Sequence, residues 1–353
     1  MSLQEDNKFD IYFQHTLNET LIFVGHGLHS DHQVEMRILP AEPNSGIVFV
    51  RSDVNPEHAE IPASWYKVID THLCTTLGNP AGVHVSTVEH LMAALYACGV
   101  DNARIIINGP EVPILDGSAL PFVSRIHKAG TVRQPELRRA ILIKSSISTC
   151  DMEKHASFHP SPVPWISLEI DFDSTVIGRQ LLSLPVDLKT FREELAPART
   201  FGFEDQVNAL RDLGFARGGT LHNSILIKDN KIVNEDGLRY VDEFVRHKAL
   251  DSIGDMALAG ARIVGQFSGC RTGHKLNIAL LRELMLRNDC WEYTTLLDAH
   301  AYWKRTNVIT RVNINKSSKA GVEFEFVTKS QKVTKTPLCE SCEAPIGAGN
   351  SQA

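Results

Sequence analysis

The sequence predicts an α+β fold in which two related α+β layers face each other, with the functional site between them. Apolar stretches of strand length alternate with helical segments along the whole chain. The order of elements also repeats: a helix with His90, a glycine, a strand, a turn and a helix near Ser118 are followed later by the same series from His247 to His274. The length of 353 residues fits two domains.

The first half begins with short strands separated by clusters of proline, asparagine and glycine, which are typical of turns. A helix follows at 87–98, because its apolar residues recur at intervals of three and four and form one amphipathic face. Gly99 is placed to end this helix. We expect strands at 21–24, 34–39, 46–50 and 103–107, and a second helix at 118–128 that ends at Gly130.

The stretch 131–139 is polar, contains Pro135 and shows no periodicity, so we place the domain boundary there. The expected first domain is 1–130 and the expected second domain is 137–299. Residues 300–353 form a C-terminal extension rich in Lys, Thr and Ser. We expect one strand in it, at 322–327, and a disordered end of ~20 residues.

The second half starts with strands and continues with a helix bounded by Gly202 and Gly214, a hairpin, and a long helix closed by Gly260. The expected strands are 140–147, 166–172, 180–186 and 262–267, with the hairpin at 224–227 and 231–234. The expected helices are 204–213, 242–259 and 274–287.

Composition excludes several classes of protein. The net charge is −6, and no basic stripe is present, so nucleic acid is not an expected partner. No run approaches the ~20 apolar residues that span a bilayer, and the polar first residues predict no secretory signal. The seven cysteines are odd in number and scattered, which favours reduced thiols and a cytoplasmic location.

The long helix carries the sharpest group of chemical side chains. His247 and Asp251 are four residues apart and share one face, with Asp255 a further turn along. An imidazole and a carboxylate in this arrangement can bind one zinc ion. The alternative is a solvated helix face with a simple His–Asp pair.

The segment Ser86–Thr87–Val88–Glu89–His90 also has two interpretations. As structure, Ser86 and Glu89 match a capping box at a helix start. As chemistry, His90 can bind a metal while Glu89 acts as a general base beside it. Catalytic zinc usually has three protein ligands and one open position, which His90, His247 and Asp251 would satisfy.

Two further segments could contribute to a site. His274 stands at a probable helix start after Gly273, where the helix dipole favours negative charge, so it could stabilise an oxyanion or simply act as a surface or capping residue. Thr200 and the phenylalanines beside it could line a pocket or belong to core and turn. The single Cys339–x–x–Cys342 pair does not support a zinc ribbon, and no phosphate-binding glycine loop is present.

Taken together, these segments resemble the zinc-dependent UDP-3-O-acyl-N-acetylglucosamine deacetylases of lipid A biosynthesis. The resemblance covers about residues 14–295. It rests on these motifs in order: Gly25–His26–Gly27–Leu28–His29–Ser30, Leu73–Cys74–Thr75–Thr76, Ser86–Thr87–Val88–Glu89–His90–Leu91, Pro113–Ile114–Leu115–Asp116–Gly117–Ser118, Ala198–Arg199–Thr200–Phe201–Gly202–Phe203, Asn234–Glu235–Asp236–Gly237–Leu238–Arg239, Phe244–Val245–Arg246–His247–Lys248 with Asp251, Gly254 and Asp255, and Gly273–His274–Lys275–Leu276–Asn277.

The resemblance implies a role for each matching residue. His90, His247 and Asp251 would hold one Zn²⁺, and Glu89 would be the general base. The other catalytic residues would be His274, held by Asp255, and Thr200, which donates to the oxyanion. The implied substrate-binding residues are Phe201, Phe203, Lys248, Cys74 and His29.

The resemblance also implies a fold and a reaction. The fold is two α+β sandwich domains packed face to face, each with a small insert, and the second insert, about 203–232, forms a passage for the acyl chain. The reaction is hydrolysis of the N-acetyl group of UDP-3-O-acyl-N-acetylglucosamine, by a cytoplasmic monomer with at most transient contact with the inner membrane. No role follows for the extension or its cysteines.

Two other classes of protein fit the same residues. One is a zinc hydrolase that acts on a different acylated sugar or amide, which substrate screening would distinguish. The other is a non-catalytic binding protein with a structural zinc. Structural zinc usually has four protein ligands, whereas three are expected here, and Glu89 and His274 also argue for catalysis.

Overall fold

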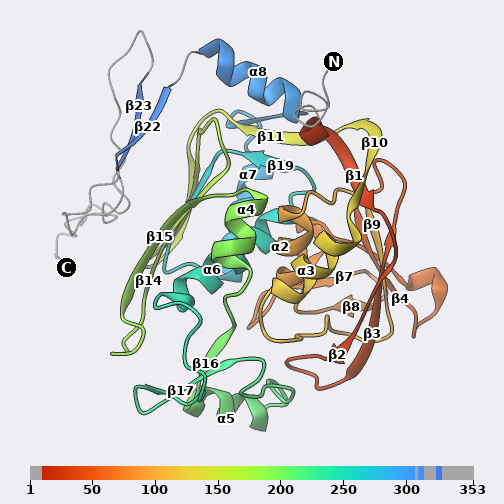
Figure 1. Ribbon diagram of the computed structural model, residues 1–353, viewed down its shortest axis with the longest axis vertical. Coiled ribbons are helices and arrows are strands. Elements are labelled where there is room, and N and C mark those ends of the chain that lie inside the picture. The colour runs from red at the N-terminus through yellow and green to blue at the C-terminus, as the bar shows by residue number, and fades with distance from the viewer. Residues whose placement is uncertain (1–9, 307–308, 314–322, 328–353) are drawn as a thin grey trace, which may run out of the picture.

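The computed structural model describes residues 10–306, 309–313 and 323–327. Two five-stranded sheets lie on opposite sides of the molecule, with helices α2 (Glu89–Ala97), α3 (Leu120–Ala129) and α6 (Glu243–Ala257) between them (Figure 1). The predicted α+β fold is therefore confirmed. Among the described helices, none has the length and apolar character needed to cross a membrane.

The two large sheets have the same topology. The first has the order β2-β3-β9-β4-β5 and the second the order β12-β13-β20-β14-β15. In each sheet the first two neighbouring pairs are antiparallel, the third is parallel and the last is antiparallel. The strands are β2 (Leu21–His26), β3 (Gln33–Pro40), β4 (Ile47–Arg51), β5 (Glu60–Pro62), β9 (Ala103–Ile107), β12 (Ile147–Asp151), β13 (Lys154–His159), β14 (Trp165–Asp171), β15 (Arg179–Pro185) and β20 (Gln266–Cys270).

Helices follow the same repeat. Helix α2 precedes β9 and α3 follows it, just as α6 precedes β20 and α7 (His274–Leu286) follows it. Helices α2 and α6 pack directly against each other at the centre of the molecule. The repeat of element order read from the sequence is thus present in space, and it pairs the helix of His90 with the helix of His247.

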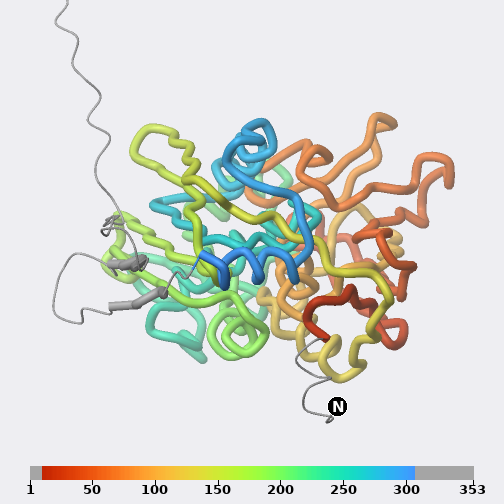
Figure 2. The backbone as a smooth tube through the Cα atoms, turned by 90° about the horizontal axis from the view of Figure 1, so that it is seen from above, coloured from red at the N-terminus to blue at the C-terminus, as the bar shows by residue number. Residues whose placement is uncertain are grey.

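Smaller sheets connect and extend the two layers. Strand β1 (Phe13–Leu17) pairs with β10 (Thr131–Leu137), and the path of these segments along one side can be followed in Figure 2. Among the described residues, three further sheets have three strands each. The first contains β6 (Val68–Asp70), β7 (Thr76–Gly78) and β8 (His84–Val85), and the second contains β11 (Arg139–Ile143), β19 (Arg262–Val264) and β21 (Trp291–Thr295). The third contains β16 (Phe201–Phe203), β17 (Ile225–Lys228) and β18 (Lys231–Ile232). The remaining helices are α4 (Leu188–Thr190), α5 (Glu204–Asp212) and α8 (Leu296–Thr306), with single turns at Asp10–Tyr12, Pro56–His58, Trp65–Lys67 and Phe191–Leu195.

Most expected elements are found within a few residues of their predicted bounds. Helices α2 and α3 end where glycines with positive φ follow, Gly99 (φ 76°) and Gly130 (φ 77°). The insert contains the expected helix α5 and the hairpin β17–β18, which hang below the two layers in Figure 1. Helix α2 is more buried than an amphipathic helix, since every residue from Glu89 to Leu95 is buried between its neighbours.

Three sequence expectations were wrong. The stretch 131–139 contains strand β10 rather than an unpatterned linker; Pro135 lies opposite an irregularity in the register of β1, where a missing N–H is tolerated. The hairpin β12–β13 was missed because its residues are largely polar. The expected strand 262–267 is two strands of different sheets, divided at Gly265, where an added Cβ would lie 2.6 Å from the Ile143 side chain.

The domain boundaries remain predictions. The expected extension begins inside α8, and its expected strand is β23 (Glu323–Val327), which pairs with β22 (Ile309–Asn313). Residues 1–9, the rest of the extension and its two cysteines lie outside the described residues.

Candidate metal centre

A close contact at one glycine brings the chemical side chains of both halves together. Helix α2 begins at Glu89 and carries His90, and α6 carries His247, Asp251 and Asp255. The two helices approach so closely at Gly254 that an added Cβ would lie 2.0 Å from the backbone oxygen of Glu89. Glycine at this position therefore sets the distance between the two sets of side chains.

Replacing Gly254 with alanine should separate α2 from α6 and destabilise the protein by roughly 1–3 kcal/mol or more, because the new methyl meets backbone and cannot be accommodated by a rotamer change. The shift of the urea unfolding midpoint measures this. Gly273→Ala is the control: its φ is −163° and nothing lies within 4 Å of the added methyl. An equally small effect of both substitutions would contradict the close approach.

His90, His247 and Asp251 form a compact buried cluster. One ligand atom of each lies within 4.8 Å of the other two. The Nε2 atoms of His90 and His247 are 3.4 and 3.3 Å from the same oxygen, Oδ1 of Asp251. That oxygen is buried and has no hydrogen-bond partner among the described residues. Two imidazole nitrogens and an unpaired carboxylate oxygen in this arrangement could hold a metal ion.

The surroundings of the cluster favour ligands in the form that binds metal. Nδ1 of His247 is 3.1 Å from the backbone oxygen of Ala198, so it donates there and leaves the Nε2 lone pair free. Burial lowers the pKa of His247 to about 3. Burial acts to raise the pKa of Asp251, but His247 and Lys248 outweigh it and hold that pKa well below its usual range. Neutral imidazole and ionised carboxylate are the species that bind metal.

His274 begins α7 and faces the cluster. Its Nδ1 donates to Oδ2 of Asp255 at 2.9 Å, and its Nε2 lies 3.6 Å from Oε1 of Glu89. Burial alone would lower the pKa of His274, but the carboxylates of Asp255 and Glu89 outweigh burial and raise it to about 10. The imidazole is therefore a cation near neutral pH, and its Nε2–H faces Glu89, which lies beside the cluster of His90, His247 and Asp251.

Asp255 orients His274 and is itself held in place. Its carboxylate accepts hydrogen bonds from the Thr75 hydroxyl at 2.6 Å and from the Asn277 amide at 2.8 Å, besides His274. No role was assigned to Thr75 or Asn277 from the sequence, although both lie inside motifs already noted. Their function depends on contacts between segments far apart in the chain, which spacing does not reveal.

Glu89 is buried beside His274 and does not cap the helix. The residue before the helix is Val88, without a side-chain cap, and Ser86 instead accepts from the Thr76 hydroxyl. The capping-box interpretation is therefore wrong. One oxygen of Glu89 accepts from the Thr75 N–H at 3.1 Å and the other faces His274. Burial raises the pKa of Glu89, which His274 and His90 oppose.

Of the predicted substrate-binding residues, Lys248 and Phe201 lie beside the cluster. Nζ of Lys248 donates to Oδ2 of Asp251 at 2.9 Å and is 5.6 Å from the centre of the Phe201 ring. The Phe201 ring centre is 6.3 Å from that of His247. A buried ion pair of Arg199 with Glu243, at 2.9 Å, anchors the backbone just before Thr200.

Known proteins resemble this chain over most of its length. The family model described as UDP-3-O-acyl N-acetylglycosamine deacetylase matches residues 14–286. This chain belongs to that family. A UDP-3-O-acyl-N-acetylglucosamine deacetylase of Phenylobacterium zucineum (strain HLK1) is 47% identical over 286 residues, which cover 81% of this chain and 98% of that protein. Those of Geotalea uraniireducens (strain Rf4) and Haemophilus influenzae (strain 86-028NP) are 46% and 42% identical, covering 80% and 81% of this chain and 92% and 94% of theirs.

In this member of the deacetylase family, a cavity of about 400 Å³ leads from Thr200 and Phe201 into the insert. Its walls are mostly apolar and come from α5, β17 and the loop that carries Leu28 and His29. Phe203 is not part of this wall; its ring packs on that of Phe172, with centres 6.1 Å apart. The cavity lies where the insert was expected to form a passage.

The two remaining predicted residues, Cys74 and His29, line a neighbouring cavity of about 390 Å³. Burial raises the pKa of the Cys74 thiol to about 12, so it stays protonated near neutral pH. Both ring nitrogens of His29 are buried without a hydrogen-bond partner among the described residues. Glu111, which sequence reasoning missed, holds this loop by accepting from the N–H groups of His29 and Ser30 at 2.9 and 2.8 Å.

Proposed function

We propose that this protein is a zinc-dependent deacetylase that hydrolyses the N-acetyl group of UDP-3-O-acyl-N-acetylglucosamine. The products are acetate and UDP-3-O-acyl-glucosamine, and the reaction is the committed step of lipid A biosynthesis. The observation that carries the proposal is the convergence of His90, His247 and Asp251 beside Glu89 and His274. Names of relatives that cover most of the chain support the substrate.

Zinc is the proposed metal because two imidazole nitrogens and one carboxylate oxygen leave a fourth position open, the pattern of catalytic zinc sites. When bound, zinc would act as a Lewis acid that polarises the acetamide carbonyl and lowers the pKa of water. His90, His247 and Asp251 would hold it, and the Ala198 carbonyl and Lys248 would orient two of these three ligands.

Glu89 and His274 would divide the proton transfers. The Glu89 carboxylate takes a proton from the attacking water. The His274 imidazolium and the Thr200 hydroxyl donate to the oxyanion that forms on the acetamide carbonyl, and losing one such donor typically costs about 3–4 kcal/mol of transition-state stabilisation. The leaving amine needs a proton, which Glu89 or His274 supplies; Asp255 keeps the His274 ring in position.

We further propose that Phe201, Lys248, Cys74 and His29 contact the sugar and diphosphate, and that the apolar cavity in the insert holds the acyl chain. Phe203 would support this wall through Phe172 rather than touch the substrate. We also propose that the protein works as a cytoplasmic monomer with at most transient contact with the inner membrane.

The proposed activity is tested by acetate release from UDP-3-O-myristoyl-N-acetylglucosamine, with UDP-N-acetylglucosamine as the control substrate. We expect release from the acylated substrate, loss of release after chelation and recovery with one equivalent of zinc. A rate that does not change on chelation would exclude zinc dependence. Faster turnover of the unacylated sugar would point to a different substrate.

Filling the acyl passage should impair long-chain substrates selectively. Val207 lines the cavity from α5, and Val207→Trp should displace at least two methylene groups; at about 0.8 kcal/mol each this raises KM for the myristoyl substrate about tenfold. KM for a butanoyl substrate should change little. Asp205→Trp, on the exposed side of the same helix, is the matched control. Equal effects on both substrates would contradict the passage.

A further inference from the structure

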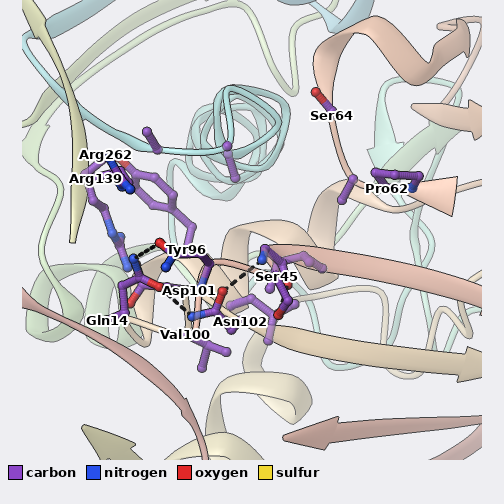
Figure 3. A pocket seen from close by; sticks show the side chains of 18 of the residues that line it. Gln14, Ser45, Pro62, Ser64, Tyr96, Val100, Asp101, Asn102, Arg139 and Arg262 are labelled. Carbon is purple, nitrogen blue, oxygen red and sulfur yellow. Dashed lines mark hydrogen bonds between the residues drawn. The ribbon is translucent and has the colours of Figure 1, made fainter. Parts of the chain in front are cut away.

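A separate cavity of about 430 Å³ lies at the C-terminal ends of α2 and α6, away from the Glu89 end of α2. It is formed by both halves, with Met92, Leu95 and Tyr96 on one side and the turn after α6 on another. Figure 3 shows Arg139, Arg262 and Tyr96 grouped on one side of it, with Pro62 and Ser64 on the other. Nothing in the proposed reaction uses this cavity.

Three charged side chains line this cavity: Asp101, Arg139 and Arg262. Asp101 is already neutralised, because both its oxygens accept from Arg138, with Nε at 2.9 and 3.0 Å and Nη2 at 2.8 Å, and one also accepts from the His15 N–H at 2.8 Å. Arg139 and Arg262 have no carboxylate partner among residues 10–306. The wall therefore presents two positive charges without a counter-charge.

Arg262 is held in place but its charge is not satisfied. Its guanidinium carbon lies 4.1 Å from the centre of the Tyr96 ring, a cation–π contact that fixes the plane of the group. Its Nη2 atom is buried and has no hydrogen-bond partner within the described part of the chain. Burial lowers the pKa of Arg262, and the neighbouring Arg138 lowers it further, against Tyr96 and Asp101. A cation with a buried, unpaired nitrogen is unfavourable unless an anion completes it.

The guanidinium groups of Arg138 and Arg262 both lie at the end of α2. Gly99 has φ 76°, and a Cβ at this position would lie 3.5 Å from Nη2 of Arg138 and 3.9 Å from Nη2 of Arg262. The Gly99 carbonyl accepts from Arg138 at 2.8 Å, at the negative end of the helix dipole. Arg138 thus has all its main partners within the protein, whereas Arg262 and Arg139 remain available to a ligand.

We propose that this cavity binds a small anion whose carboxylate or phosphate group pairs with Arg262 and Arg139 and whose body lies against Tyr96. Guanidinium groups match the planar pair of oxygens of either anion. The cavity volume of about 430 Å³ and its mixed polar and apolar lining favour a molecule larger than a bare ion. The ligand would join the two halves of the molecule at the end of both central helices.

Titration calorimetry with 4-bromobenzoate and with inorganic phosphate tests this on the full chain. We expect saturable binding of at least one probe, and the probe that binds distinguishes carboxylate from phosphate. Arg262→Gln should weaken binding by about tenfold or more, as for loss of a charge-assisted hydrogen bond. Arg139→Gln, at an exposed position, should also weaken it, whereas Arg104→Gln, an exposed arginine paired with Glu60, should not.

The position of the ligand is tested separately, so the result does not depend on the folding of Arg262→Gln. In crystals of the wild type with 4-bromobenzoate, the bromine anomalous signal should lie in this cavity, with the carboxylate on Arg262. The proposal is overturned by absence of saturable binding for both probes, by unchanged affinity in Arg139→Gln and Arg262→Gln, or by a bromine signal elsewhere. A cavity filled by water alone would overturn it as well.

Discussion

Replacing Glu89 with glutamine should reduce acetate release by about two to four orders of magnitude while the bound metal is retained. The amide keeps the shape of the side chain and still accepts the hydrogen bond from the Thr75 N–H, which is 3.1 Å in the native protein. It cannot take a proton from water. Because Glu89 is not one of the three clustered donors, the metal should remain.

The rate is measured as acetate release at saturating substrate, and the metal content by elemental analysis of the same sample. Glu57→Gln is the control and should behave like the wild type, because Glu57 lies on the exposed single turn Pro56–His58, outside the cluster. A Glu89→Gln rate within about threefold of the wild type would remove Glu89 from the mechanism, since general-base catalysis typically contributes at least 10²-fold.

Replacing Asp251 with asparagine should weaken zinc binding by about 100-fold or more, because even residues that only support metal ligands cost 10–100-fold when changed. Oδ1 of Asp251 lies 3.3–3.4 Å from both histidine nitrogens and has no hydrogen-bond partner in the part of the chain that the structure describes, so the cluster is arranged around this oxygen. The substitution also leaves Lys248, now bonded to Oδ2 at 2.9 Å, without its carboxylate.

Competition with a chromophoric chelator measures the zinc affinity of this variant. Asp242→Asn provides the matched control, because Asp242 precedes the same helix and pairs with Arg246 at 2.6 Å, outside the cluster. If Asp251→Asn and the wild type bound zinc equally well, Asp251 would not be a ligand. Equal loss in both variants would indicate a general effect on the helix instead.

The sequence predicts the half of the centre that lies on one helix and only suggests the other half. His247 and Asp251 are four residues apart, so helical geometry alone brings them together, and the structure confirms it. His90 belongs to another helix, and its approach depends on the contact of α2 with Gly254. The repeated order of elements was the only signal from the residues for this pairing, and the shared sheet topology is its structural counterpart.

Local sequence patterns gave wrong predictions where contacts between distant segments determine the structure. Ser86 and Glu89 match a capping box in sequence, but Glu89 is buried beside His274 and its carboxylate accepts from the Thr75 N–H instead. The polar hairpin β12–β13 is held in the sheet because β13 pairs with β20, which lies more than a hundred residues later in the chain. The supporting roles of Thr75 and Asn277, and the cavity at Arg262, likewise arise from segments that are distant in the chain.

We propose that residues from both halves hold one zinc ion beside a base that drives deacetylation. The most direct test measures zinc content and acetate release together, in wild type and in Glu89→Ala, with UDP-3-O-myristoyl-N-acetylglucosamine as substrate. We expect one zinc per chain in both proteins and acetate from the wild type alone. Wild-type protein that binds no zinc, or that releases acetate equally well without it, would contradict zinc-dependent deacetylation.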